Sequence, residues 1–359
     1  MRLLFLTEFY PQNKRLVYTG GVEVRTYHVA ERAKKDFAVK IISSNSSHVP
    51  ATPGSILSRL MYLWTSFWQA FNTPFDLIEG SNFVTYWPAF LAAKIKGKPV
   101  VAWIPDVLGR RWFDFGFLVG LFGWLAEIIA LKLPWDALIA LSNSTKTKLT
   151  NHGVPASKIT VVYAGVDPQE FQFKKPQKFS APTVICIARL VGTKRVVDLI
   201  EAFNQLLKSV PRAKLIIVGR GPKKKQLLEL VNQLELTGSV SFYENLSRQE
   251  LLQLLSRCQL LCLPSVVEGF GLVTIEAMSL GIPVVLADIP INREVTQSGK
   301  GAVFFKPADA GDMAEKIKQL LTDKKLYRQK EGETKNVAGI YRWPDIYRQT
   351  KQVYLQALK

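Results

Sequence analysis

The feature that most constrains the fold is an alternation of short apolar runs with longer runs of helix formers, repeated twice along the chain. In the first half the apolar runs are 3–6, 37–43, 76–80, 100–104, 137–141 and 159–163. In the second half they are 183–188, 213–219, 239–244, 260–264, 283–287 and 302–305. Short strands separated by helices predict parallel sheets with helices on both faces. We therefore expect an α/β protein with two doubly wound units in tandem.

The alternation breaks once, and the break predicts the domain boundary. It falls at the sequence AGVDP, residues 164–168, and a polar, lysine-bearing segment follows. Such a segment is typical of a linker. We expect a Rossmann-like N-terminal domain over 1–170, a linker over 171–181 and a Rossmann-like C-terminal domain over 182–342, followed by a closing helix over 343–359.

Charge and cysteine content limit the partners and the compartment. The formal net charge is +18, spread over both halves, and such a surface attracts phosphorylated substrates, anionic lipid or nucleic acid. The aromatic residues do not flank the Lys223–Lys225 run as they would in a single-strand binder, so nucleic acid is not expected as a partner. The three cysteines follow no disulfide or zinc spacing, which favours a reducing compartment and hence the cytoplasm. The apolar N-terminal run is too short for a signal peptide.

Unusual residues gather where the predicted strands end. In doubly wound sheets, ligands bind beyond the carboxyl ends of the strands. Gly20 and Gly21 come between the first strand and its helix, Asp106 follows the strand at 100–104, and Gly219 ends the strand at 213–219. If the strand ends of the two sheets face each other, these residues border one interdomain cleft.

The stretch 264–281, PSVVEGFGLVTIEAMSLG, predicts a strand end, a glycine turn and a helix. The amides at such a helix start can bind a phosphate or a hydroxyl group. Glu268 lies in the turn and Glu276 inside the helix, where a carboxylate can also simply favour the helix dipole. Arg189 and Lys194, on the turn after another strand, form either a clamp for a diphosphate or two solvated surface cations.

Taken together, these motifs resemble the retaining glycosyltransferases of the GT-B fold, family 4 (group 1). The matching segments are GGVE, VVYAGVDPQEF, ARLVGTK, IVGRGP, LPSVVEGFGLVTIEAMSLGIPVV with its E-x7-E pattern, and the closing helix with its tryptophan. The resemblance spans nearly the whole chain and is densest over 183–305. It implies two Rossmann-like domains facing across a cleft, and a closing helix from Trp343 that crosses back onto the first domain.

The resemblance also implies roles for individual residues. Arg189 and Lys194 would hold the donor diphosphate, and Glu276 the ribose. The remaining predicted contacts to the donor are Glu268, the amides of Phe270, Gly271 and Leu272, the glycine Gly219, and the pair Gly20 and Gly21, which also lies near the acceptor. No metal or other cofactor is expected. Asp106 follows the strand where many relatives carry a histidine, and it either contacts the sugar or acceptor hydroxyl or only shapes the pocket.

The predicted activity is transfer of a sugar, with retention, from a UDP- or GDP-sugar to a hydroxyl acceptor such as a lipid-linked glycan or a cell-envelope polysaccharide precursor. A sugar-nucleotide epimerase on the same fold and a non-catalytic nucleotide-sugar or glycan binder are the alternatives. Two aromatic, apolar stretches, 56–75 and 115–133, suggest peripheral contact with an anionic membrane on its cytoplasmic face. Packing against neighbouring helices or a dimer partner is the other explanation, and the sequence leaves the oligomeric state open.

Overall fold

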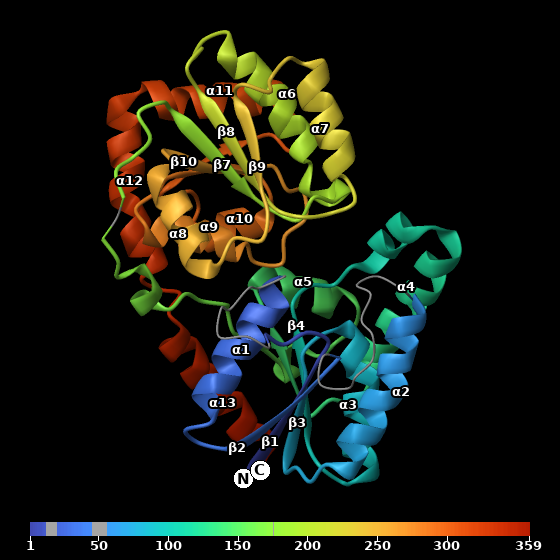
Figure 1. Cartoon of the computed structure of the whole chain (residues 1–359). Helices are drawn as coiled ribbons and strands as arrows, with labels where there is room; N and C mark the ends of the chain where they lie inside the picture. The colour runs from blue at the N-terminus through green and yellow to red at the C-terminus, as the bar shows by residue number, and fades with distance from the viewer. Residues whose placement is uncertain (12–19, 45–55, 175) are drawn as a thin grey trace. The chain divides into compact units, whose positions relative to one another are not determined.

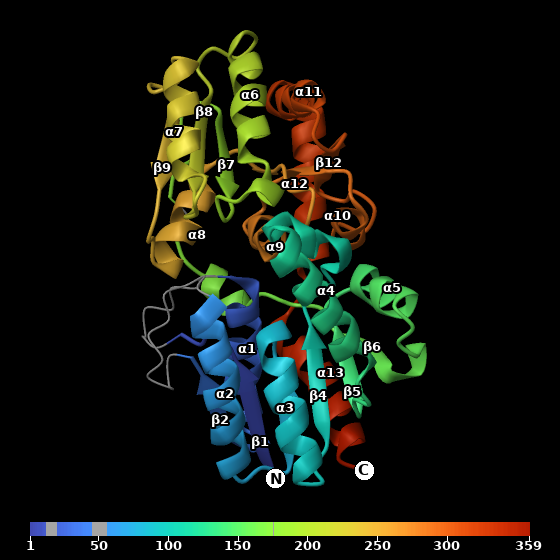
Figure 2. The same ribbon diagram turned by 90° about the vertical axis from the view of Figure 1, so that its right-hand side faces the viewer.

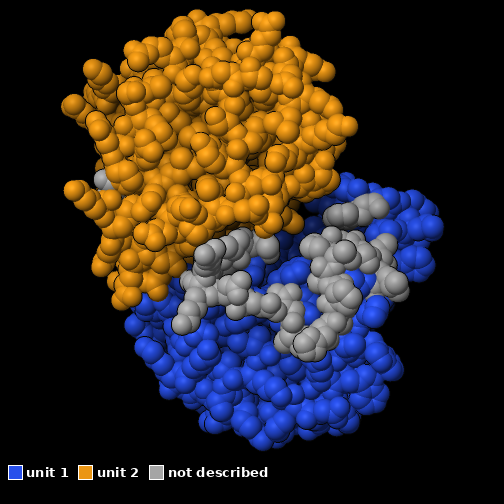
Figure 3. All heavy atoms as spheres, in the orientation of Figure 1, with its two compact units in different colours: residues 1–164, 343–359 blue, residues 165–342 orange. Residues whose placement is uncertain are grey.

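The computed structural model describes residues 1–11, 20–44, 56–174 and 176–359. The chain divides into two compact units, shown in separate colours in Figure 3. Unit 1 comprises Met1–Ala164 and Trp343–Lys359, and unit 2 comprises Gly165–Arg342. Each unit is built on one parallel sheet with helices on both faces (Figure 1).

In the described part of unit 1, a six-stranded sheet has the order β2-β1-β3-β4-β5-β6. Its strands are β1 (Arg2–Thr7), β2 (Ala38–Ser43), β3 (Leu77–Gly80), β4 (Val100–Ile104), β5 (Ala137–Ala140) and β6 (Ile159–Val161). All neighbouring pairs are parallel, and every residue of β3 and β4 is buried. Burial on both faces explains why these strands read as continuous apolar runs and not as alternating ones.

The α-helices of unit 1 are α1 (Gly21–Ala33), α2 (Ile56–Asn72), α3 (Phe83–Ile95), α4 (Phe117–Lys132), α5 (Asn143–Asn151) and α13 (Trp343–Ala357). Short 3-10 segments are η1 (Gly109–Phe115) and η2 (Ala156–Lys158). The C-terminal helix α13 packs on α1, where the buried Trp343 stacks on His28 with ring centroids 4.9 Å apart. Figure 2 shows α2, α3 and α4 along one side of the sheet.

In the described part of unit 2, the second six-stranded sheet has the order β12-β11-β10-β7-β8-β9. Its strands are β7 (Thr183–Ile187), β8 (Lys214–Val218), β9 (Val240–Tyr243), β10 (Leu260–Leu263), β11 (Val284–Ala287) and β12 (Ala302–Phe305). The helical segments are η3 (Pro168–Phe171), η4 (Gly192–Lys194), α6 (Val196–Leu207), α7 (Lys224–Gln233), α8 (Arg248–Arg257), α9 (Leu272–Ser279), α10 (Pro290–Val295), α11 (Ala310–Thr322) and α12 (Lys324–Ala338). This strand order is that of a dinucleotide-binding sheet.

The predicted fold class is confirmed: each predicted apolar run is a strand, and the two sheets are doubly wound. The predicted 19-residue apolar run over 115–133 is interrupted, because η1 ends at Phe115 and Gly116 takes a φ of 97° before α4 begins. A Cβ at Gly123 would lie 2.3 Å from the Trp112 ring, so glycine there permits η1 to pack against α4. The buried Glu127 of α4 accepts the amides of Leu108 and Gly109 at 3.0 and 2.7 Å.

The division between the units lies between Ala164 and Gly165, six residues before the boundary expected from sequence. Val166 explains the earlier division, because its amide donates to the Tyr341 carbonyl at 2.8 Å, near the other end of unit 2. The expected linker over 171–181 belongs to unit 2, and its described residues pack on the rest of that unit. Arg257 of α8 stacks over Phe179 at 4.1 Å, and the Phe179 amide donates to the Arg257 carbonyl at 2.9 Å.

Candidate active site

The candidate site in unit 2 lies where the strand order of its sheet reverses. Strand β7 comes first in this sheet, and its neighbours β8 and β10 lie on opposite sides of it. The loops that follow β7 and β10 therefore leave the same edge of the sheet side by side. The first carries Arg189 and Lys194, and the second carries Glu268.

The structure brings these two loops into direct contact. Lys194, the last residue of η4, forms an ion pair with Glu268 and donates to the Val267 carbonyl at 3.3 Å. Beside them, the Val266 amide donates to the Thr193 carbonyl at 3.2 Å. The side chains of Lys194 and Glu268 are each only 14% exposed. Partial burial strengthens this pair relative to a solvated one, and it places a cation next to the glycine turn.

The glycine turn ends at the start of α9. Gly271 precedes the helix with a φ of 78°, a conformation that favours glycine, and Leu272 is the first helical residue. Amides in the first turn of a helix have no acceptor within the helix, so this turn presents donors. Phe270 is buried and packs edge-on against Tyr341, with ring centroids 5.3 Å apart. Its side chain anchors the turn, which leaves only its backbone for the predicted role.

Arg189 is exposed, and no hydrogen bond or ion pair to its side chain occurs within the described part of the chain. It is therefore available to a ligand. Gly219 has a structural explanation of its own: a Cβ there would lie 1.9 Å from the Ala188 carbonyl oxygen. The glycine permits β8 and β7 to end in close contact next to Arg189.

Glu276 takes part in a buried cluster that the sequence did not predict. Its Oε1 accepts from Nη1 of Arg248 at 2.7 Å, and Nε of the same guanidinium donates to Oε2 of Glu170 at 2.9 Å. Burial opposes the charge of Arg248, but the two carboxylates outweigh it and raise the pKa of Arg248 further above its usual value. Burial also raises the pKa of Glu170, against the attraction of Arg248.

A local signal for this cluster does exist in the sequence. Arg248 is the first residue of α8, directly after the N-cap Ser247, which forms a capping box with Glu250. A cation is unfavourable at the positive end of a helix dipole, so an arginine there suggests a carboxylate partner elsewhere. Glu170, in η3, gives no such signal.

In unit 1, the predicted residues lie at the ends of strands or the start of a helix. Gly20 precedes α1 with an extended backbone, and no atom of the described residues lies within 4 Å of a Cβ placed there. Neither strain nor crowding by the described chain explains this glycine. Gly21 is the exposed first residue of α1. Asp106, after β4, accepts from Nζ of Lys148 in α5 at 2.6 Å and from the Val107 amide at 2.8 Å. Asp106 is thus already held by a cation of its own unit.

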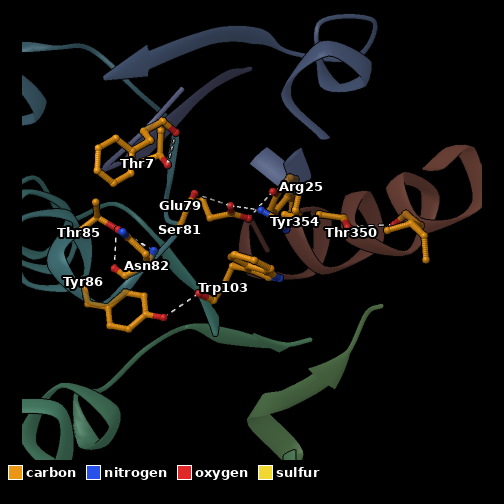
Figure 4. Close-up of polar contacts among 12 residues, drawn as sticks. Thr7, Arg25, Glu79, Ser81, Asn82, Thr85, Tyr86, Trp103, Thr350 and Tyr354 are labelled. Carbon is orange, nitrogen blue, oxygen red and sulfur yellow. Dashed lines mark hydrogen bonds and ion pairs between the residues drawn. The ribbon is translucent and has the colours of Figure 1, made fainter. Parts of the chain in front are cut away.

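A fully buried polar network in unit 1 was also missed by sequence reasoning (Figure 4). Glu79 of β3 forms an ion pair with Arg25 of α1 and accepts from the hydroxyls of Tyr354 in α13 and Ser81, the latter at 3.1 Å. Arg25 also stacks over the Trp103 ring at 4.8 Å. Burial, reinforced by Glu79, raises the pKa of Tyr354 well above its usual value. The network joins three elements that are distant in sequence.

Two features bear on metal binding and on membrane crossing. Among the described residues, no group of three or more histidine, cysteine, aspartate or glutamate side chains is arranged to hold a metal ion. Within the same residues, no helix has both the length and the apolar character that crossing a bilayer requires.

Comparison with known proteins identifies the family. The model "Glycosyltransferase Family 4" matches residues 19–170, and "Glycosyl transferases group 1" matches residues 168–336. A glycogen synthase of Mycobacterium tuberculosis is 26% identical over 79% of this chain and 69% of its own length. An N,N'-diacetylbacillosaminyl-diphospho-undecaprenol alpha-1,3-N-acetylgalactosaminyltransferase of Campylobacter jejuni is 25% identical over 81% of this chain and 79% of its own length.

Solved structures agree on the fold. Anabaena HepE in complex with UDP-glucose superposes with a TM-score of 0.79 and 20% identity, covering 99% of both chains. The two family models together extend from residue 19 to residue 336, one on each of the two doubly wound units. The chain belongs to the group 1, family 4 glycosyltransferases of the GT-B fold, which are transferases of glycosyl groups.

Proposed function

We propose that the protein transfers a sugar, with retention of anomeric configuration, from a UDP- or GDP-sugar to a hydroxyl group of a glycan or lipid-linked acceptor. The observation that carries this proposal is the contact between Lys194 and the Glu268 turn at the strand-order reversal of unit 2. The named relatives support the substrate classes: HepE is described with UDP-glucose, and the Campylobacter enzyme acts on a diphospho-undecaprenol glycan.

The proposed chemistry replaces one bond at the sugar. The bond between the anomeric carbon and the β-phosphate oxygen breaks, the acceptor oxygen bonds to that carbon on the same face, and the acceptor proton passes to the departing phosphate. Lys194 and Arg189 stabilise the negative charge that grows on the diphosphate, a role that elsewhere falls to a metal ion. Glu268 and the amides of Phe270, Gly271 and Leu272 orient the sugar and phosphate. We propose that no metal takes part.

Assays of nucleotide sugars test this activity. A UDP- or GDP-sugar is expected to raise the unfolding temperature of the protein. In the presence of EDTA, the enzyme is expected to glycosylate acceptor glycosides, and NMR is expected to show that the new linkage has the anomeric configuration of the donor sugar. Lys194→Ala and Glu268→Ala are each expected to lower turnover by about 100-fold or more. Lys318→Ala, which removes an exposed ion pair with Glu315, is the control and keeps full turnover.

Three results contradict the proposal. Turnover of the Lys194→Ala or Glu268→Ala protein close to wild type would remove the site assignment. Epimerisation or hydrolysis of the donor without any acceptor would favour the epimerase, and donor binding with no turnover across acceptors would favour a non-catalytic binder.

We further propose that unit 1 lies against an anionic membrane surface through an apolar face formed by α2, α3, η1 and α4. Its exposed large apolar side chains are Leu60, Met61, Trp64, Trp68, Leu91, Ile95, Phe113, Phe117, Leu118, Val119, Phe122, Leu125 and Ile129. Helices α2 and α3 carry no acidic residue, and the single acidic residue of α4, Glu127, is buried. The segment η1 carries one exposed acidic residue, Asp114, next to Arg110 and Arg111. Basic side chains border the face at Arg59, Arg110, Arg111 and Lys132. An apolar face with a basic border suits anionic lipid headgroups.

Sedimentation with vesicles of phosphatidylglycerol and phosphatidylcholine tests this surface. Binding is expected at low salt and is expected to weaken as salt rises. The Trp64→Ser and Phe122→Ser variants, which change side chains that are 65% and 68% exposed, should each bind roughly tenfold more weakly. Leu228→Ser, in α7 of unit 2, should bind like wild type. Wild-type protein that stays in the supernatant at low salt would refute the membrane contact.

A further inference from the structure

The Glu170–Arg248–Glu276 cluster lies beside the candidate donor site, and the proposed chemistry does not use Arg248. The side chains of Arg248 and Glu276 are 14% and 6% exposed, and that of Glu170 is 20% exposed. Nη1 of Arg248 donates to Glu276, and Nε and Nη2, on another edge of the guanidinium, contact Glu170. Such a two-sided contact fixes both carboxylates at once, which a flexible cation cannot do.

The contact is asymmetric on Glu276. Arg248 donates to Oε1 only, and Oε2 has no hydrogen-bond partner among the residues that the structure describes. A carboxylate that is held by one oxygen keeps its other oxygen in a fixed direction. That second oxygen can accept hydrogen bonds, and vicinal hydroxyl groups are donors that suit it.

The charges of the cluster make Arg248 necessary for this arrangement. Glu170 and Glu276 are like charges and repel each other, and burial together with the charge of Glu276 raises the pKa of Glu170. The single guanidinium between them keeps two carboxylates close together in a mostly buried place. Without its bridge, Glu276 would lose its fixed direction.

We propose that Arg248 is a positioning residue, which holds Glu276 so that its Oε2 accepts the ribose hydroxyls of the donor nucleotide and thereby selects ribonucleotides. The inference rests on the proposed use of a nucleoside diphosphate sugar. It adds that the selection depends on α8, through Arg248, and on the η3 segment, through Glu170. Neither residue touches the nucleotide.

Binding of matched nucleotides separates this role from a purely structural one. The probes are UDP, GDP and their 2′,3′-dideoxy analogues, measured by calorimetry on the full chain. The wild-type protein is expected to bind the ribonucleotide about 10- to 100-fold more tightly than its dideoxy analogue, the range for hydrogen bonds to a charged group. Glu276→Gln is expected to reduce this ratio.

Arg248→Lys keeps the charge but not the two-sided bridge. Arg248→Lys is expected to lower the ratio of ribonucleotide affinity to dideoxy-analogue affinity at least about fivefold, by weakening only the binding of the ribonucleotide. In a protein that already carries Glu276→Gln, Arg248→Lys is expected to cause no further decrease, because the effects of coupled residues are not additive. Arg257→Lys makes the same substitution at the other end of α8, where the guanidinium stacks over Phe179, and should leave the ratio unchanged.

The outcomes are distinguishable. If Arg248→Lys weakens the ribonucleotide and the dideoxy analogue equally, or leaves the ratio at the wild-type value while Glu276→Gln lowers it, the positioning role is wrong. If wild-type protein binds neither UDP nor GDP, the donor class under the proposed function is wrong and this inference is lost with it.

Discussion

Replacing Tyr354 by phenylalanine is the most direct test of what attaches the C-terminal helix to unit 1. The Tyr354 hydroxyl donates to Oε2 of Glu79, and neither residue has any exposed surface. The substitution removes one donor to a buried carboxylate and changes the shape of the core little. Hydrogen bonds to charged groups contribute about 1.5–3 kcal/mol, so we expect Tyr354→Phe to destabilise unit 1 by about that amount.

A second tyrosine on the same helix provides the control. The Tyr347 hydroxyl donates to Oδ2 of Asp36 at 2.6 Å, and Asp36 is exposed and also accepts from Lys351. Water can replace the lost donor there, so Tyr347→Phe is expected to cost less than about 1 kcal/mol. The two variants remove the same atom from the same helix, and they differ in the burial of the acceptor.

Scanning calorimetry measures the difference, because a chain with two units need not unfold in a single transition. For a unit of this size, about 2–4 °C is lost per kcal/mol, so Tyr354→Phe should lower the transition of unit 1 by about 3–12 °C. Tyr347→Phe should lower it by a smaller amount. Equal shifts for the two variants, or no shift for Tyr354→Phe, would show that burial of Glu79 does not control the attachment of α13.

Two further predictions concern unit 2 and the thiols. Gly219→Ala should destabilise unit 2 by more than about 1 kcal/mol, because the added Cβ would collide with the Ala188 carbonyl oxygen. Gly238→Ala, where no described atom crowds the added Cβ, should not destabilise unit 2, and urea unfolding compares the two variants. Burial raises the pKa of Cys186 and of Cys258 to about 12 and that of Cys262 well above its usual value, so native protein should not react with a disulfide reagent at pH 9. Unfolded thiols ionise from about pH 8.5, so the free energy of unfolding should fall as pH rises from there towards 12, and reaction of native thiols at pH 9 would contradict their burial.

The strands could be predicted from sequence because burial on both faces leaves a local signal. All residues of β4 and β10 are buried, and each strand is a continuous apolar run of the length that a strand requires. The observed strand ends differ from the expected ones by a residue or two. For example, β5 ends at Ala140 and not at residue 141, because the exact end of a strand depends on its pairing with neighbouring strands.

The contact of Lys194 with the Glu268 loop could also be anticipated, although the two residues are 74 positions apart. Both follow strands of one parallel sheet, and the rule for strand ends brings such residues to one edge. What the sequence could not supply was the strand order, which makes β7 and β10 neighbours.

The buried ion clusters could not be predicted by the same reasoning. Arg25 and Glu79 are 54 residues apart, and Glu79 and Tyr354 are 275 apart. Each lies within an element whose apolar pattern gives no sign of a charged partner. Their contacts depend on how α1 and α13 pack on the sheet, which periodicity does not specify.

The two guanidinium clusters nevertheless differ in a way that bears on function. In unit 1, Arg25 and Glu79 are 2% and 0% exposed, and both oxygens of Glu79 have partners within the described chain. The Glu79 carboxylate is thus fully paired, although Nη2 of Arg25 and Nε1 of Trp103 are buried without a hydrogen-bond partner among the described residues. The physical effect of this cluster is to fix helices on the sheet. In unit 2, Glu276 has one oxygen held by Arg248 and one oxygen without a partner among the described residues. That oxygen is not among the buried polar atoms that lack a partner, so a hydrogen-bond donor from outside the chain can reach it. The second oxygen of Glu276, which is unpaired and can be reached, is therefore what assigns ligand recognition to the cluster of unit 2, whereas the fully paired and fully buried Glu79 assigns stability to the cluster of unit 1.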